Sequence, residues 1–286
     1  MSRQRLFSAR IVRLSAVMAS CAVCVALMGA SRGAITKLTL DPDIPVVDLF
    51  DGIDHGQFDV RLVAQNANEG KIFITNKTDK PLTVEIPKGL VGVQILAQPG
   101  FNVGNMMIGG PNAGNGQVGQ NGQKGAAQAV GGNAVPAPNN GVNNGFPGNN
   151  GNNGNGIFSI PPEKTVQIGL SSVCLNHGRR EPHAGLKYQL VRAESVTTDP
   201  LVLQLLENYS PTVNREAQQA AAWHLASGLT WEQIAQLSDE KLAGLQAPLF
   251  TAQQIQNAQT LVEQVKKDAA DRPKKADTVR SVVTNR

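Results

Sequence analysis

The stretch that decides the fold runs from residue 58 to residue 86 and reads FDVRLVA at 58–64, KIFIT at 71–75 and LTVEI at 82–86. In these segments apolar and polar side chains alternate with a period of two, which is typical of β-strands with one buried face. The sequence NKTDKP at 76–81 separates the last two segments and consists largely of turn-forming residues. These residues predict antiparallel strands joined by short turns.

Further segments of the chain extend this pattern, at 91–96, 157–160, 165–170 and 188–191. Short strands with turn signals about every 8–12 residues are typical of a sandwich of two antiparallel sheets. The sequence therefore predicts an antiparallel β-sandwich over residues 58–198. Residues 34–57 are expected to form an extended segment that precedes it.

More than half of residues 99–156 are Gly or Asn, and Lys124 is the only charged residue among them. Such a segment has few apolar side chains to bury and much backbone entropy to lose on folding. We therefore expect a long disordered Gly/Asn-rich insertion between two strands of one sandwich. Neither half of the sandwich has enough strands to close a core alone.

From Asp199 onward the apolar residues recur at helical spacing. Asp199, which precedes a proline, and Asn214 are predicted N-caps, and TWEQ at 230–233 reads as a capping box. These signals predict a small α-helical module over residues 199–265. A basic disordered tail is expected at 266–286.

Residues 1–33 predict a secretory signal peptide. Arginines precede an uncharged, mostly apolar run at 14–30, and small residues follow it. The run is short for a membrane span, so we expect a secreted, periplasmic or envelope protein with no stable span after processing. An alternative is lipid attachment at Cys21, because MASC at 18–21 resembles a lipoprotein processing box.

The charge and the cysteines change once this leader is removed. The formal net charge of +4 depends on the five arginines of residues 1–33, so the remaining chain is close to neutral. A near-neutral chain gives no reason to expect a nucleic-acid partner. Cys174 is the one cysteine left, so no internal disulfide can form. The alternation over residues 168–174 predicts that its thiol faces inward and is inert.

CLNH at 174–177, followed by His183, and NKTDKPLTV at 76–84 resemble the ligand loop and the first-ligand turn of cupredoxins. This resemblance implies a β-sandwich and, as metal-ligand candidates, Cys174, His177 and His183. A blue-copper centre needs two imidazoles and a thiolate, but Leu82 stands at the first-ligand position. We therefore favour no metal site and expect no cofactor.

A second resemblance involves QAAAW at 219–223, which is similar to the Gln-x-Ala-x-Trp segment of bacterial surface thioester domains. It implies a covalent adhesin in which the side chain of Gln219 is joined to the thiol of Cys174. An alanine-rich helix with a packing tryptophan explains the same residues, because Ala and Gln are good helix formers.

The chain lacks the Gly-x-Ser-x-Gly, His-Glu-x-x-His and phosphate-loop signatures, and we assign no catalytic residues. We therefore expect a non-enzymatic structural or interaction module of the cell envelope, with an envelope protein or polymer as its partner. One alternative is a thioester- or metal-dependent surface adhesin that uses Cys174. Another is an accessory domain of an envelope hydrolase system.

Overall fold

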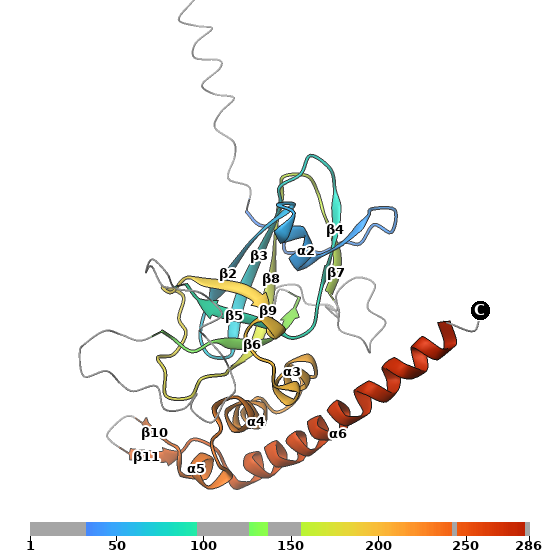
Figure 1. Ribbon diagram of the computed structural model, residues 1–286. Helices are drawn as coiled ribbons and strands as arrows, with labels where there is room; N and C mark the ends of the chain where they lie inside the picture. Colours follow the sequence, from blue (N-terminus) through green and yellow to red (C-terminus); the bar gives the residue numbers. More distant parts are fainter. Residues whose placement is uncertain (1–32, 96–125, 137–155, 242–244, 284–286) are drawn as a thin grey trace, which may run out of the picture. The chain divides into compact units, whose positions relative to one another are not determined.

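The computed structural model describes residues 33–95, 126–136, 156–241 and 245–283 (Figure 1). The chain divides into two compact units, Met1–Gly33 and Ala34–Arg286, and the description below concerns the second. The predicted signal peptide and most of the predicted insertion lie outside the described residues.

Six antiparallel strands close into a barrel in the order β2-β3-β8-β6-β5-β9. They are β2 (Phe58–Ala64), β3 (Glu69–Asn76), β5 (Leu90–Gln94), β6 (Val130–Val135), β8 (Thr165–Cys174) and β9 (Tyr188–Arg192). The barrel closes where β2 meets β9, with Leu62 paired to Tyr188. Closure pairs the two outer strands of the sheet with each other, which protects their edges.

The predicted β-sandwich is therefore wrong, although the strands that suggested it are present. Leu62, Ile72 and Ile168 are buried in one apolar cluster, as the alternation of their segments requires. Alternation determines which side chains face inward, but it does not determine whether a sheet curls until its outer strands meet.

Strand β6 also corrects the predicted disordered insertion, because it lies within residues 99–156 and pairs with both β8 and β5. A side chain at Gly131 would contact Leu206 and Leu175 at 2.6 and 2.9 Å, so this position needs the absence of a Cβ atom. The Asn133 side chain accepts a hydrogen bond from Gly89 N and donates one to Tyr209 O, both at 2.8 Å. The Gly and Asn residues that suggested disorder are thus the ones that close packing requires at β6.

A second sheet of three strands packs with the barrel and contains β1 (Val46–Asp48), β4 (Leu82–Ile86) and β7 (Gly156–Ile160). Strand β1 is parallel to β4, and β7 is antiparallel to it. Helix α2 (Leu49–Asp54) begins at Asp48, whose side chain accepts hydrogen bonds from two backbone N–H groups of the first turn. The segment expected to be extended thus contributes a strand and a short helix.

The helical part contains the 3₁₀ turn η2 (Ala193–Ser195), α3 (Pro200–Glu207), α4 (Arg215–Ser227), α5 (Trp231–Gln236), the hairpin β10 (Ser238–Lys241) and β11 (Leu245–Pro248), and α6 (Ala252–Val283). The predicted N-caps at Asp199 and Asn214 and the capping box at Thr230 are confirmed. Helix α6 continues through much of the predicted tail. Among the described residues, no helix combines the length and the apolar character needed to cross a membrane.

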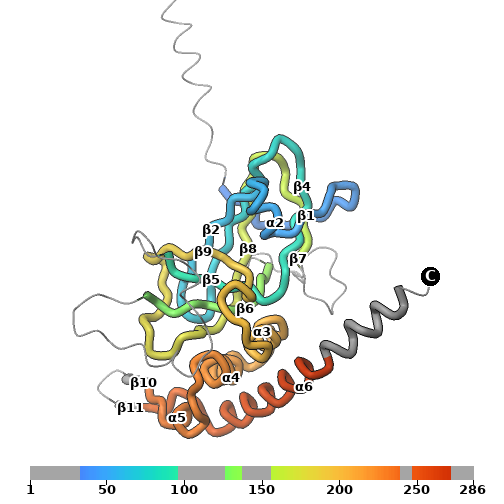
Figure 2. Tube along the Cα trace, viewed as in Figure 1, coloured from blue at the N-terminus to red at the C-terminus, as the bar shows by residue number. Residues whose placement is uncertain are grey.

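Helix α4 lies between strand β8 and helix α6, and α3 lies beside β6 (Figure 2). One apolar cluster joins the helices to the barrel, combining the small side chains of α4 with Val173 and Leu175. Because alanines fill most of the buried face of α4, its backbone can approach the barrel closely. This contact brings α4 to the end of β8, where the site described next is found.

Candidate functional site

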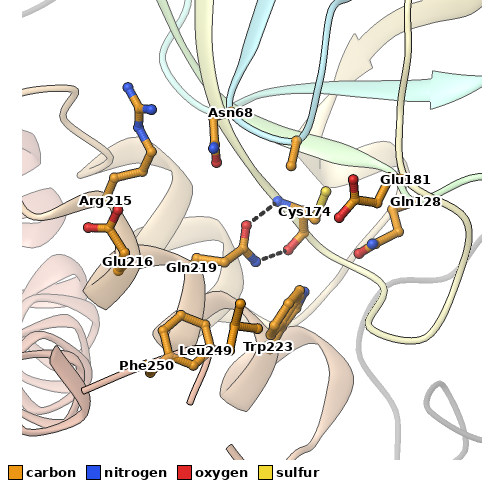
Figure 3. Close-up of a pocket in the computed structure, with 11 residues that line it drawn as sticks. Asn68, Gln128, Cys174, Glu181, Arg215, Glu216, Gln219, Trp223, Leu249 and Phe250 are labelled. Atoms are coloured by element: carbon orange, nitrogen blue, oxygen red, sulfur yellow. Dashed lines mark hydrogen bonds between the residues drawn. The ribbon is translucent and has the colours of Figure 1, made fainter. Parts of the chain in front are cut away.

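A half-open cavity of about 190 Å³ lies at the mouth of the barrel, where β8 ends beside α4 (Figure 3). The β2–β3 turn, the end of β8, the segment before β6, helix α4 and the segment before α6 all contribute to it. Its lining comprises Ala67, Asn68, Gln128, Cys174, Glu181, Arg215, Glu216, Gln219, Trp223, Leu249 and Phe250. We call it the mouth cavity.

The Gln219 carboxamide fixes α4 to the last residue of β8 (Figure 3). Its Oε1 accepts a hydrogen bond from Cys174 N, and its Nε2 donates one to Cys174 O, both at 2.8 Å. Strand β3 reaches β8 only as far as the bond from Ser172 N to Asn68 O, at 2.9 Å. Backbone groups two residues apart in a strand point the same way, so Gln219 takes the place of the strand partner that Cys174 lacks.

Below this contact, the Cys174 thiol is buried, with 1 % of the residue exposed. The inward position that the alternation predicted is therefore present. Burial, reinforced by the negative charge of Glu181, raises the pKa of the thiol to about 12. The thiolate is the nucleophilic form of cysteine, so Cys174 is neutral and unreactive at ordinary pH.

We expect a thiol reagent to label Cys174 slowly in the folded protein and fast after denaturation. Cys174→Ala should lower the free energy of unfolding by roughly 1–3 kcal/mol, as for other large-to-small core changes. Fast labelling of the folded protein would contradict the buried thiol. If the thiol stayed unlabelled after denaturation, it would be covalently modified.

The same thiol gives a pH dependence with a definite sign. From pH 9 to pH 12 the folded protein keeps a proton that the unfolded chain has lost, because folding raises the pKa from its ordinary value of 9.0 to about 12. The free energy of unfolding therefore falls as the pH rises through this window. Denaturant titrations at pH 8 and pH 10 should show a smaller decline for Cys174→Ala than for the wild type.

The structure thus brings together the two residues of the thioester resemblance, Cys174 and Gln219, but in a different arrangement. A thioester would join Cys174 Sγ to the side-chain carbonyl carbon of Gln219 and release ammonia. Instead, both polar atoms of the carboxamide bind the main chain of Cys174. In Figure 3 the sulfur points away from Gln219, toward Glu181.

The three residues of the metal resemblance do not converge. His177 packs edge-on against Trp223, with the ring centroids 4.7 Å apart, and burial lowers its pKa. His183 is exposed, and its Nδ1 accepts a hydrogen bond from Gly185 N within its own turn. Across the described part of the chain, no three His, Cys, Asp or Glu side chains are grouped so that they could hold a metal ion. Leu82 lies in the three-stranded sheet rather than in the barrel.

Two residues of the mouth cavity carry polar atoms that are buried and have no hydrogen-bond partner among the described residues. They are Gln128 Oε1, which can only accept a hydrogen bond, and Trp223 Nε1, which can only donate one. Gln128 is 4 % exposed. Figure 3 shows the indole nitrogen on the edge of the ring turned toward the Gln128 carboxamide.

Sequence reasoning did not identify either residue as part of a site. Gln128 lies in the Gly/Asn-rich tract that predicted disorder, and Trp223 reads as a packing residue of an alanine-rich helix. Gln128 is held in place by its backbone, because its N donates to Arg180 O at 2.9 Å and its O accepts from the Tyr188 hydroxyl at 3.0 Å. These contacts join distant parts of the chain, and nothing in the local sequence signals them.

The rim of the cavity is polar and carries both signs of charge. Glu181 and Glu216 are exposed, and Arg215 lies 3.8 Å from Glu69 on the neighbouring strand. The opposite wall is apolar, with Phe250 packed edge-on against Trp223 at a centroid distance of 5.8 Å. An apolar wall with a few convergent polar groups is typical of binding sites for small molecules, which are often found in the mouths of β-barrels.

Comparisons with family models, with characterised proteins and with solved structures find no match to this chain.

Proposed function

We propose that this protein is an exported, non-enzymatic interaction module of the cell envelope, and that the mouth cavity is where it binds its partner. The observation that carries the proposal is the pair of buried, unpartnered polar atoms on Gln128 and Trp223 within one half-open cavity. An unpaired buried polar group costs free energy, and a bound partner would remove that cost.

The chemistry around the cavity supports binding rather than catalysis. Cys174, the nucleophile candidate nearest the cavity, keeps its proton at ordinary pH because burial raises its pKa. His177, which faces Trp223, is held neutral by burial and lacks a thiol or hydroxyl partner to activate, since its backbone N donates to the hydroxyl of Ser227 at 2.9 Å. Export is supported by the leader sequence at residues 1–33.

A covalent adhesin is the second candidate function, and the contact between Cys174 and Gln219 favours it. The same contact supports a purely structural role, because the carboxamide satisfies two backbone groups of β8. Labelling of the denatured protein separates the two roles, since a thioester would leave no free thiol.

We expect the protein isolated from its own cells to begin near Ala34 and to sediment with purified envelope material. Trp223→Ala should reduce the sedimented fraction at least several-fold, because it removes a wall of the cavity. Exchange of the exposed His55 for Ala serves as the control and should leave binding unchanged. N-terminal sequencing and quantitative co-sedimentation are the measurements.

An intact Met1 on the protein from cells, or a lipid on Cys21, would contradict the proposed processing. Equal sedimentation of the wild type and of a folded Trp223→Ala variant would contradict binding through the cavity. Thermal unfolding of each variant shows whether it is folded.

A further inference from the structure

The two unpartnered atoms of the mouth cavity specify the hydrogen-bonding character of a ligand. Trp223 Nε1 offers a donor and Gln128 Oε1 offers an acceptor, and both open on the same cavity. A ligand that satisfies both must carry an acceptor and a donor close together. A secondary amide has this arrangement, with a carbonyl oxygen and an N–H on adjacent atoms.

The charge of the cavity floor favours an uncharged group at this point. Cys174 is neutral, and the nearest carboxylate is that of Glu181. A carboxylate or phosphate on the ligand would be repelled by Glu181 and could not accept a hydrogen bond from the Gln128 acceptor. An ammonium group would leave the Trp223 donor unpaired.

The main chain around the cavity argues against an extended peptide as the source of the amide. Peptides commonly bind by pairing with a free strand edge. Here the free edge is at Cys174, and Gln219 already pairs with both of its backbone groups. The amide must therefore come from a compact group that needs no strand partner.

The size and walls of the cavity fit one sugar ring. A cavity of about 150 Å³ holds a benzene molecule, and the mouth cavity measures about 190 Å³. Trp223, Leu249 and Phe250 offer an apolar wall for a methyl group and for the C–H face of a ring. Asn68 and Arg215, together with the carboxylates of the rim, can bind ring hydroxyls.

We propose that the mouth cavity binds an N-acetylated amino sugar through its acetamido group. The indole N–H of Trp223 donates to the acetamido carbonyl oxygen, and Oε1 of Gln128 accepts from the acetamido N–H. This inference rests on the proposed function for the place where such a sugar is met, since N-acetylated amino sugars are components of envelope polymers. It adds the chemical class of the partner.

The protein carries an internal probe for this proposal. It has two tryptophans, and the second, Trp231, stacks on His224 with the ring centroids 4.1 Å apart. In a Trp231→Phe background the fluorescence of the full chain reports on Trp223 alone. We expect N-acetylglucosamine to change this fluorescence saturably, while glucose, which lacks the amide, leaves it unchanged.

Gln128→Leu should weaken N-acetylglucosamine binding about tenfold, on the scale of one buried hydrogen bond. Gln204→Leu is the matched control, because Gln204 is also buried but bonds Asn208 and does not line the cavity. It should bind the sugar as the parent does. Thermal unfolding of both variants shows that they are folded, and calorimetric titration gives the two affinities.

An equal response to glucose would overturn the proposal, because the amide would then be irrelevant. A response to N-acetylglycine methylamide without one to the sugar would overturn it in favour of a peptide ligand. No response to any of the three compounds would mean that the cavity holds only water. If co-sedimentation with the envelope persists in the last two cases, the proposed function stands and the sugar assignment alone fails.

Discussion

Gly132→Ala should unfold the protein or lower its free energy of unfolding by at least about 3 kcal/mol. A Cβ atom at position 132 would overlap the carbonyl oxygen of Ser171 and lie 2.7 Å from the Cα of Ser172. Both are backbone atoms of β8, so no side-chain rotation relieves the overlap. The strands would have to separate, and β6 is the strand that joins β8 to β5 in the barrel.

Gly70→Ala is the matched control, because it makes the same change in another strand of the barrel. Its nearest new contact is the carbonyl oxygen of Val63, at 3.2 Å, which a small shift accommodates. Chemical denaturation of both variants measures the difference. If Gly132→Ala is as mild as Gly70→Ala, β6 does not occupy the position between β5 and β8 described above.

The comparison of sequence and structure turns on this strand. The segments at 58–64, 71–75 and 82–86 were predictable because each carries enough alternating apolar side chains to show its buried face. Strand β6 carries glycines where it packs most closely, so its contribution comes from the backbone. Hydropathy patterns report on side chains, and a strand of this kind gives a signal typical of disorder.

The barrel could not be predicted for a related reason. Its closure depends on the pairing of Leu62 with Tyr188, two residues that are far apart in the sequence. Local alternation is the same in a sandwich and in a barrel, and only the pairing of the outer strands distinguishes them. The helix caps were predictable because each depends on a few neighbouring residues, as at Asn214 and Thr230.

The site was predictable only where one strand determined the outcome. The inward position of Cys174 follows from the alternation along β8. The pairing of Gln219 with Cys174 depends on where α4 docks, and the exposure of Gln128 to the cavity depends on the path of the Gly/Asn-rich tract. A resemblance singled out Cys174 and Gln219 for a thioester, and the structure assigns Gln219 the role of a missing strand partner.

Gln219→Leu should lower the free energy of unfolding by roughly 2–5 kcal/mol, because it leaves the N–H and the C=O of Cys174 buried without partners. Leucine has a similar size and is a good helix former, so the loss reports on the hydrogen bonds. Gln259→Leu makes the same change on the exposed face of α6 and should stay within about 0.5 kcal/mol of the wild type. Equal stability of these two variants would contradict the role of Gln219.

Gln219→Glu tests the donor half of this contact by pH. The ionised side chain would place a negative oxygen against Cys174 O, where the amide nitrogen now donates. Burial and this oxygen raise the pKa of the introduced carboxyl above its ordinary value of about 4.3. The folded variant then holds a proton that the unfolded chain has lost, so its stability falls as the pH rises through the raised pKa. Relative to the wild type, Gln219→Glu should therefore be more stable at pH 5 than at pH 8, since the protonated carboxyl can donate to Cys174 O. Denaturant titrations at the two pH values measure this difference, and a pH-independent difference would show that the bond to Cys174 O contributes nothing.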